Sequence, residues 1–217
     1  MGELFLTLAS IVILYLIYQL FFTGLAAENA SQNLVREFKQ SITEQEPVTQ
    51  TEDSKQETNQ APATVVGLLY IPKLKSDVWG EPIVYGTGYS QLAQGIGYYP
   101  NNALPSEDGN FAVAGHRVTY GQPFYYFERL AAGDEVFVLF EEGWYSYELI
   151  ADQKIQEQEV WVLGNIQEQL GLGPDERILT ITTCDPRWNS TQRWAWWGVQ
   201  TGFYPLDQPP AAIGADW

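Results

Sequence analysis

The chain has 217 residues, of which 45% are hydrophobic and 14% aromatic, enough for one packed domain with additional segments. Its net charge of −16 argues against nucleic acid as a partner and against polybasic attachment to anionic lipid, because both need clustered Lys and Arg. With one Cys and one His, neither an internal disulfide nor a structural zinc site of thiolates and imidazoles can form, and we expect no cofactor.

The N-terminus carries an uncharged apolar run from Leu4 to Phe22. Its nineteen residues are close to the length that spans a bilayer as a helix. The run is longer than the apolar region of a usual secretory signal, and no Lys or Arg precedes it. We therefore predict a transmembrane anchor over residues 1–25. A cleaved signal is the alternative, because Gly24-Leu25-Ala26 offers a small-x-small cleavage site.

The charges that flank this run give an orientation that conflicts with a secreted domain. Glu3 precedes the run, whereas Arg36 and Lys39 follow it. Taken alone, the positive-inside rule would place the C-terminal part of the chain in the cytoplasm.

Residues 26–63 are rich in Gln, Glu, Thr, Ser and Asn, and apolar residues thin out after Phe38. Such a segment has too little apolar surface to bury, so we predict a flexible polar linker. Within it, Leu34, Val35, Phe38 and Ile42 have the spacing of one short amphipathic helix.

From Thr64 onward, short apolar runs separated by turn residues predict many strands and few helices. The expected strands are Val65 to Ile71, Ile83 to Tyr85, Phe111 to Ala114, Glu135 to Phe140, Trp144 to Ala151, Arg177 to Thr183 and Trp194 to Thr201. Brief helices are expected over Ser90 to Gln94, with Ser90 as its cap, and over Phe124 to Leu130. We predict an all-β domain, a closed β-barrel over residues 64–205, followed by a frayed tail over 206–217.

The sole cysteine, Cys184, directly follows the β-branched strand Thr180 to Thr183. A strand end is held rigidly yet can be reached, which suits a nucleophile, although a free cysteine is more often a small buried apolar residue. The sole histidine, His116, also ends an apolar run, and an imidazole can shuttle protons near neutral pH. Both residues at strand ends can meet at one barrel edge, where a thiol finds the base that it needs. A structural role for His116 is the alternative.

Two arginines are candidates for stabilising an oxyanion, because guanidinium is always charged and offers several donors. Arg193 opens the last strand and Arg187 follows the cysteine by three residues, and their spacing does not choose between them. Alternation places Trp194 and Trp196 on one face of the last strand and Trp197 on the other, as core or as the wall of a groove.

Several motifs resemble those of the sortase family. Thr180-Ile181-Thr182-Thr183-Cys184 is similar to the signature Thr-Leu-x-Thr-Cys, with Ile in place of Leu, and Gly109 to Arg117 resembles the segment that carries the family's histidine. The pattern is most like that of class E sortases of actinobacteria, and it recurs in Ile83 to Gly88, Gly95 to Pro100 and Gly115 to Phe124. The resemblance extends from Val66 to Val199.

The resemblance implies a sortase β-barrel with Cys184 as nucleophile, His116 as general acid/base and Arg193 as the essential arginine, since the family's arginine opens the final strand. Thr183, Tyr120 and Trp194 are the expected substrate-binding residues. Asp185 departs from the pattern because class E often has His there, and the tryptophan-rich last strand replaces a more aliphatic one.

The resemblance also implies a reaction and a location. A sortase cleaves a C-terminal sorting signal after Thr, here expected to be Leu-Ala-x-Thr-Gly-like or Leu-Pro-x-Thr-Gly-like, and joins the acyl group to a cell-wall amine. Its partners would be surface proteins with that signal and a cell-wall precursor. Family members are single-pass membrane proteins with the catalytic domain outside, against the orientation that the flanking charges suggest.

Two other functions remain open: a secreted cysteine hydrolase that uses the same Cys–His pair, and a surface-anchored binding barrel without catalysis. A peptidoglycan L,D-transpeptidase is excluded because its Ser-His-Gly-Cys run is absent from the sequence.

Overall fold

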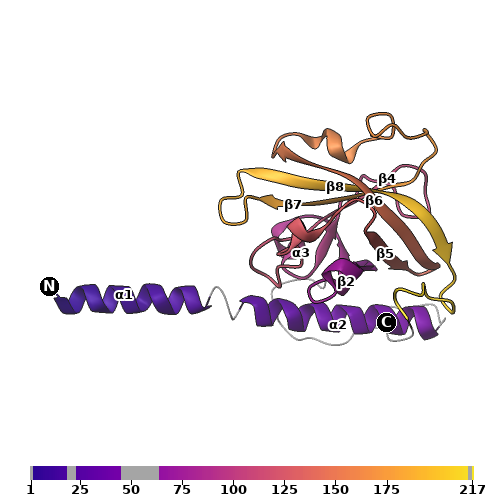
Figure 1. Ribbon diagram of the computed structural model, residues 1–217. Helices are drawn as coiled ribbons and strands as arrows, with labels where there is room; N and C mark the ends of the chain where they lie inside the picture. The colour runs from indigo at the N-terminus through magenta and orange to yellow at the C-terminus, as the bar shows by residue number, and fades with distance from the viewer. Residues whose placement is uncertain (1, 19–22, 45–63, 215–216) are drawn as a thin grey trace.

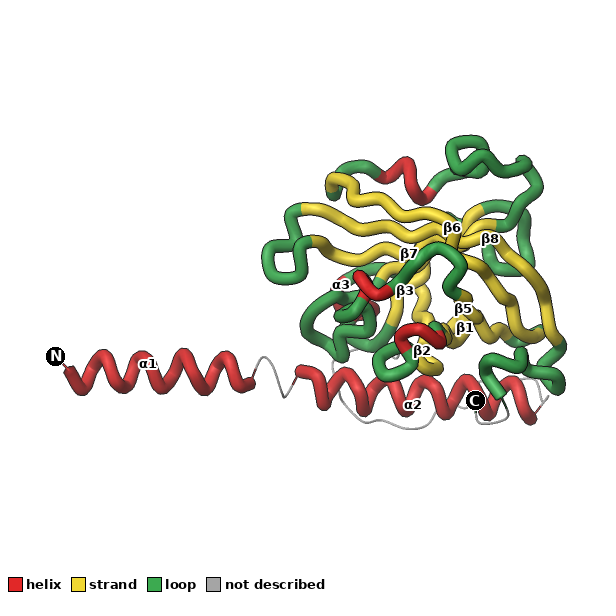
Figure 2. The backbone as a smooth tube through the Cα atoms, in the orientation of Figure 1, coloured by secondary structure: helices red, strands yellow, loops and turns green. Residues whose placement is uncertain are grey.

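The computed structural model describes residues 2–18, 23–44, 64–214 and 217. Eight strands in this part of the chain close into a barrel with the order β1-β2-β3-β4-β7-β8-β6-β5 (Figures 1 and 2). Their bounds are β1 Val65–Tyr70, β2 Trp79–Tyr85, β3 Ile96–Tyr98, β4 Asn110–Ala114, β5 Glu135–Phe140, β6 Gly143–Gln156, β7 Ile178–Asp185 and β8 Gln192–Tyr204. The predicted closed barrel is thus confirmed.

Short helices connect the strands. They are α3 (Tyr89–Leu92) and the 3-10 helices η2 (Pro72–Leu74), η3 (Phe127–Arg129) and η4 (Val160–Leu163). The predicted cap of α3 is wrong, because the helix already begins at Tyr89 and its N-cap is Gly88, without a side-chain cap bond.

Alternation along the strands fills the barrel. Every strand contributes side chains to one continuous core, for example Leu179 and Ile181 of β7 and Trp196 of β8. The residues between them face outward. Ile178, Ala195 and Trp197 form a second cluster, which η4 and the following loop cover. Trp196 and Trp197 therefore lie on opposite faces of β8, as the alternation predicts.

Two of the pairings position the strand ends that carry the sole His and the sole Cys. β4 runs parallel to β7, with Ala114 opposite Thr182. β8 runs antiparallel to β7 on its other side, with Arg193 opposite Cys184. β5 and β6 form an antiparallel hairpin, and β6 continues through Gln156 along β8.

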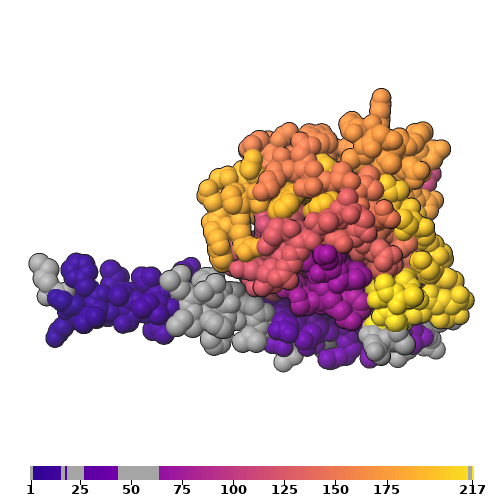
Figure 3. All heavy atoms as spheres, in the orientation of Figure 1, coloured from indigo at the N-terminus to yellow at the C-terminus, as the bar shows by residue number. Residues whose placement is uncertain are grey.

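The N-terminal region contains two helices. α1 (Gly2–Ile17) projects from the barrel (Figure 3). Its large apolar side chains from Leu4 to Tyr15 are between 49% and 75% exposed. Among the described helices, none combines the length and the apolar character that a membrane span requires. Residues 19–22 of the predicted span lie outside the described residues.

α2 (Thr23–Glu44) packs along the outside of the barrel (Figure 1). Leu34, Phe38 and Ile42 are buried, so the predicted amphipathic helix is present and is longer than its apolar residues suggested. Phe38 and Ile42 share one cluster with Trp144, while Ile213 of the predicted tail is also buried in it. The first part of the expected linker is thus helical, and residues 45–63 lie outside the described residues.

Candidate active site

Cys184 is the penultimate residue of β7 and is partly exposed. Alternation puts it on the outer face of the barrel, with Thr180 and Thr182, whereas Leu179 and Ile181 face inward. Thr180 and Thr182 are buried, so the outer face becomes accessible only at the end of the strand. The thiol is therefore held by a rigid strand and is also within reach of solvent.

His116 follows β4 by two residues. Beyond Ala114, the amide of Gly115 donates to the Thr182 carbonyl at 3.1 Å, and the Thr183 hydroxyl donates to the Gly115 carbonyl at 2.8 Å. These bonds continue the parallel pairing past the end of β4, so that His116 comes level with Cys184 on the neighbouring chain segment. Gly115 is needed there, because an added Cβ would lie 2.5 Å from the ring of Phe124.

The imidazole of His116 is mostly shielded from water. Its Nε2 is buried and, among the described residues, has no hydrogen-bond partner. Burial lowers the pKa of His116 below its usual value, since desolvation disfavours the charged form. The ring packs 5.3 Å from the ring of Tyr120, at an interplanar angle of 31°. The histidine is thus predominantly neutral at pH 7 and has an unused nitrogen.

Arg193 lies directly opposite Cys184 in the β7–β8 ladder. Opposed residues project from the same face of a sheet, so the arginine and the thiol share the outer face. The guanidinium donates to the Glu157 carboxylate at 2.5 Å and to the carbonyls of Ser190 and Gln192 at 3.2 and 3.0 Å. It is about a quarter exposed, so a substrate can compete for it with Glu157.

Arg187, the other candidate, is engaged elsewhere. Its guanidinium donates to the Tyr125 carbonyl at 2.7 Å and to Glu128 at 2.5 Å, and it stacks 3.9 Å above the Tyr125 ring. The register therefore brings His116, Cys184 and Arg193 into one row across three adjacent segments, each about 4.8 Å from the next. Arg187 is not in this row.

Two of the three expected substrate-binding side chains do not share the face of the thiol. The Thr183 side chain is buried between strands, where its hydroxyl bonds Gly115. Trp194 lies opposite Thr183, packs against the barrel core and donates from Nε1 to Asp152 at 2.7 Å.

The third, Tyr120, stands beside His116. It belongs to a tight loop in which Thr119, Tyr120 and Gln122 all have positive φ angles, of 66°, 48° and 43°. Its hydroxyl contacts the hydroxyl of Tyr89, and that hydrogen bond is the main reason that the pKa of Tyr120 is raised to about 12. Sequence reasoning missed Tyr89, since nothing in the sequence indicates that the start of α3 meets this loop.

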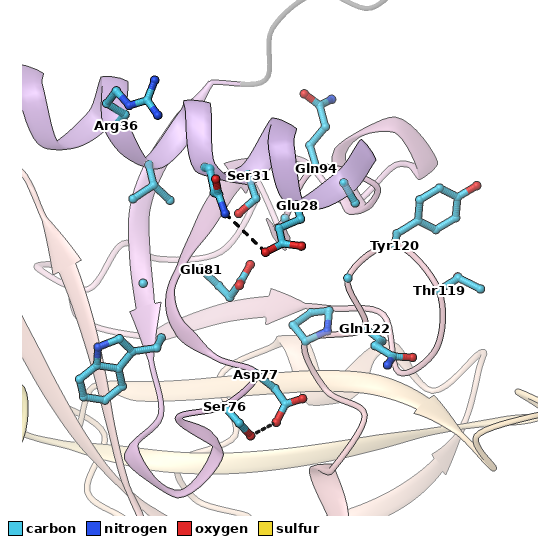
Figure 4. A pocket seen from close by; sticks show the side chains of 18 of the residues that line it. Glu28, Ser31, Arg36, Ser76, Asp77, Glu81, Gln94, Thr119, Tyr120 and Gln122 are labelled. Carbon is cyan, nitrogen blue, oxygen red and sulfur yellow. Dashed lines mark hydrogen bonds between the residues drawn. The ribbon is translucent and has the colours of Figure 1, made fainter. Parts of the chain in front are cut away.

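A cavity of about 760 Å³ separates α2 from the same loop (Figure 4). Glu81 of β2 points toward Ser31 and Glu28 of α2 in this cavity. Burial raises the pKa of Glu81 to about 7, the hydrogen bond with Ser31 lowers it, and the charges of Glu28 and Asp77 raise it further. Within the described residues, no group of three or more His, Cys, Asp or Glu can hold a metal ion.

Comparison with known protein families finds that residues 69–201 match the sequence pattern of the sortase domain. The chain therefore belongs to the sortase family, whose characterised members are cysteine transpeptidases.

Class E sortases are among its relatives. Sortase SrtE1 of Streptomyces coelicolor is 29% identical over 91% of this chain, and the matched region is 55% of that relative's length. The structure of sortase E from Streptomyces avermitilis is 35% identical, with a TM-score of 0.62 over 69% of this chain and 96% of that one. Sortase E1 of Streptomyces coelicolor, crystallised with a tripeptide in its active site, is 33% identical, with a TM-score of 0.64 over 71% and 99%.

Proposed function

We propose that this protein is a class E-like sortase, a membrane-anchored cysteine transpeptidase. The observation that carries the proposal is the row of His116, Cys184 and Arg193 across β4, β7 and β8. A thiol between a neutral imidazole and a guanidinium has the base and the oxyanion partner that acyl transfer requires.

In the first half of the reaction, the Cys184 thiol gives its proton to Nε2 of His116 and attacks the threonine carbonyl of a sorting signal. The new C–S bond produces a tetrahedral oxyanion, to which Arg193 donates after leaving Glu157. One such donor is worth about 3 kcal/mol of transition-state stabilisation. The C–N bond to glycine then breaks, and His116 passes its proton to the departing amine.

In the second half, an amine replaces the lost glycine. Its nitrogen attacks the thioester, its proton moves to His116, and the thiol leaves with that proton. The lowered pKa of His116 favours the neutral imidazole that must accept a proton at this step.

The proposed donor substrates are surface proteins with a Leu-Ala-x-Thr-Gly-like signal, or second a Leu-Pro-x-Thr-Gly-like one, and the acceptor is a cell-wall amine. The tripeptide in the active site of the Streptomyces coelicolor relative supports a peptide as the occupant of this site. Tyr120, which packs against His116, is the best-supported contact with that peptide. For Thr183 and Trp194 we propose indirect support of the site from the opposite face.

The proposed organisation is an anchor over 1–25, a linker over 26–63 that includes α2, the catalytic barrel over 64–205 and a tail over 206–217. The anchor is supported by the exposed apolar side chains of α1 from Leu4 to Leu14, which suit a lipid environment. The barrel would then lie outside the cell, as is general in the family.

Intact-mass measurement of the acyl-enzyme tests this function. The full chain in detergent, mixed with a Leu-Ala-x-Thr-Gly peptide, should gain the mass of the peptide up to its threonine. The Cys184→Ala variant is the control and should gain nothing. An unmodified wild-type protein that also leaves the peptide uncleaved would refute the proposal and favour a binding barrel.

A further inference from the structure

A buried ion pair joins the two residues that directly follow the histidine and the cysteine. Arg117 follows His116 and Asp185 follows Cys184, and both are only 5% exposed. Nη1 of Arg117 donates to Oδ1 of Asp185 and, at 3.4 Å, to the carbonyl oxygen of Cys184. The segment that follows β4 and the end of β7 are thus linked again one residue beyond the proposed catalytic pair.

Other charged groups complete the arrangement around this pair. Lys154 lies 3.0 Å from the second oxygen of Asp185, and Glu128 accepts from Nη2 of Arg117 at 3.1 Å. The guanidinium of Arg117 also lies 5.1 Å from the centre of the Trp194 ring. Each buried charge therefore has an opposite charge, and the fork of Arg117 is held in one orientation by contacts on three sides.

Stability alone is a weak explanation for such a pair. Removing two charges from water is costly, and a buried ion pair is frequently no more stabilising than apolar side chains of the same volume. What an arginine provides is direction, because its donors are fixed in a plane, and here Nη1 donates to Asp185 while Nη2 donates to Glu128. The geometry that it fixes here is that of the segments carrying His116 and Cys184.

The backbone around His116 has few other contacts with β7. β4 ends at Ala114, and the last inter-strand bonds before the histidine are those of Gly115. Soon after Arg117 the chain enters the loop in which all four residues from Thr119 to Gln122 have positive φ angles. His116 therefore lies between two cross-links to β7, one at Gly115 and one at Arg117. Its own carbonyl accepts from the amide of Phe124 at 3.1 Å, which does not tie it to β7.

We propose that the Arg117–Asp185 pair is a positioning element that holds His116 in register with Cys184 for acyl transfer. The proposal rests on the proposed function. A shift of about 1 Å between reacting groups can cost 100-fold in rate.

The test compares Asp185→Asn, Arg117→Gln and the double variant Arg117→Gln/Asp185→Asn in the full chain. Each single variant leaves one buried charge with fewer partners and should lower the thermal midpoint. The double variant removes both charges, so its midpoint should recover toward that of the wild type. We expect the double variant to keep KM for the peptide within about twofold and to lose at least about 30-fold in kcat. Arg117→Lys, which keeps the charge without the fork, should lie in between.

Arg187→Gln is the matched control, because it removes the other arginine bonded to Glu128 and should leave kcat within about threefold. A double variant that is folded and has wild-type kcat would overturn the proposal, as would a rise in KM at constant kcat.

Alkylation of Cys184 by iodoacetamide adds a readout that needs no turnover. The double variant should change this rate in the same direction as His116→Ala does, whereas an unchanged rate would overturn the positioning role. If the wild type transfers no acyl group, the proposed function fails, and the alkylation rates still decide whether the pair positions His116.

Discussion

The carboxyl group of Glu81 should make the stability of the fold depend on pH. Its pKa is raised to about 7, because the side chain is largely buried in the cavity between β2 and α2 with Glu28 and Asp77 nearby. The folded state therefore binds this proton more tightly than the unfolded state does. Below pH about 4.5 both states are protonated, and the contribution of Glu81 to the free energy of unfolding is fully present.

As pH rises from about 4.5 to 7, Glu81 ionises in the unfolded chain first, and the free energy of unfolding falls. Above about pH 7 both states are ionised and the loss is complete. A difference of about 2.5 pH units corresponds to at most about 3 kcal/mol at 1.36 kcal/mol per unit. Because the side chain is partly exposed and solvent screens its charge, we expect about 1–2 kcal/mol.

Urea unfolding of the wild type and of Glu81→Gln, at pH values from 4 to 8.5, measures this contribution. The wild type should lose more stability than Glu81→Gln between pH 4.5 and 7, since Gln does not titrate. Glu148→Gln, which changes an exposed carboxyl on β6, is the matched control and should follow the wild type. Parallel curves for wild type and Glu81→Gln would refute the reasoning from burial.

Three further outcomes are expected. Cys184→Ala should form no acyl-enzyme, and His116→Ala and Arg193→Ala should each lower turnover at least about 100-fold in steady-state assays. Arg187→Ala should have only a mild effect on turnover. A larger loss for Arg187→Ala than for Arg193→Ala would contradict the oxyanion role of Arg193. Phe38→Ala should lower the free energy of unfolding by about 3 kcal/mol, with exposed Glu37→Ala as control, and no loss would mean that α2 does not pack on the barrel in solution. The protein should fractionate with membranes through Leu4 to Phe22, whereas a mature N-terminus at Ala27 would mean a cleaved signal.

The strands were predictable where a run of apolar or β-branched residues extended for five residues or more, as in β5 and β7. β3 was missed, because Ile96–Tyr98 is too short for a period to be visible and contains a glycine. The length of α2 was missed for another reason. Only its C-terminal half has the apolar spacing that signals a helix, and its packing against the barrel depends on residues as distant as Ile213.

The candidate site was predictable as a set of residues and not as an arrangement. Each of His116, Cys184 and Arg193 lies at a strand end, which the sequence shows, but their row depends on β4 pairing with β7, which no local pattern encodes. The register also decides the face. Trp194 pairs with Thr183, so its side chain lies on the face opposite to the thiol. A register shifted by one residue would pair Trp194 with Cys184 and place both side chains on the same face.

The contacts of Asp185 were hidden in the same way. From the sequence it is a new negative charge beside the thiol. In the fold it belongs to the opposite face, where Arg117 and Lys154 balance it.

Ligation of a sorting peptide to an amine tests the proposed transpeptidase most directly. The full chain, incubated with a Leu-Ala-x-Thr-Gly peptide and a glycine-type amine, should yield the peptide up to its threonine joined to that amine. A bound amine held in position outcompetes far more concentrated water, so peptide loss should be slow without amine and faster with it. If amine leaves the cleavage rate unchanged and mass spectrometry finds only the free threonine acid, the protein is a hydrolase, and the transpeptidase function is contradicted.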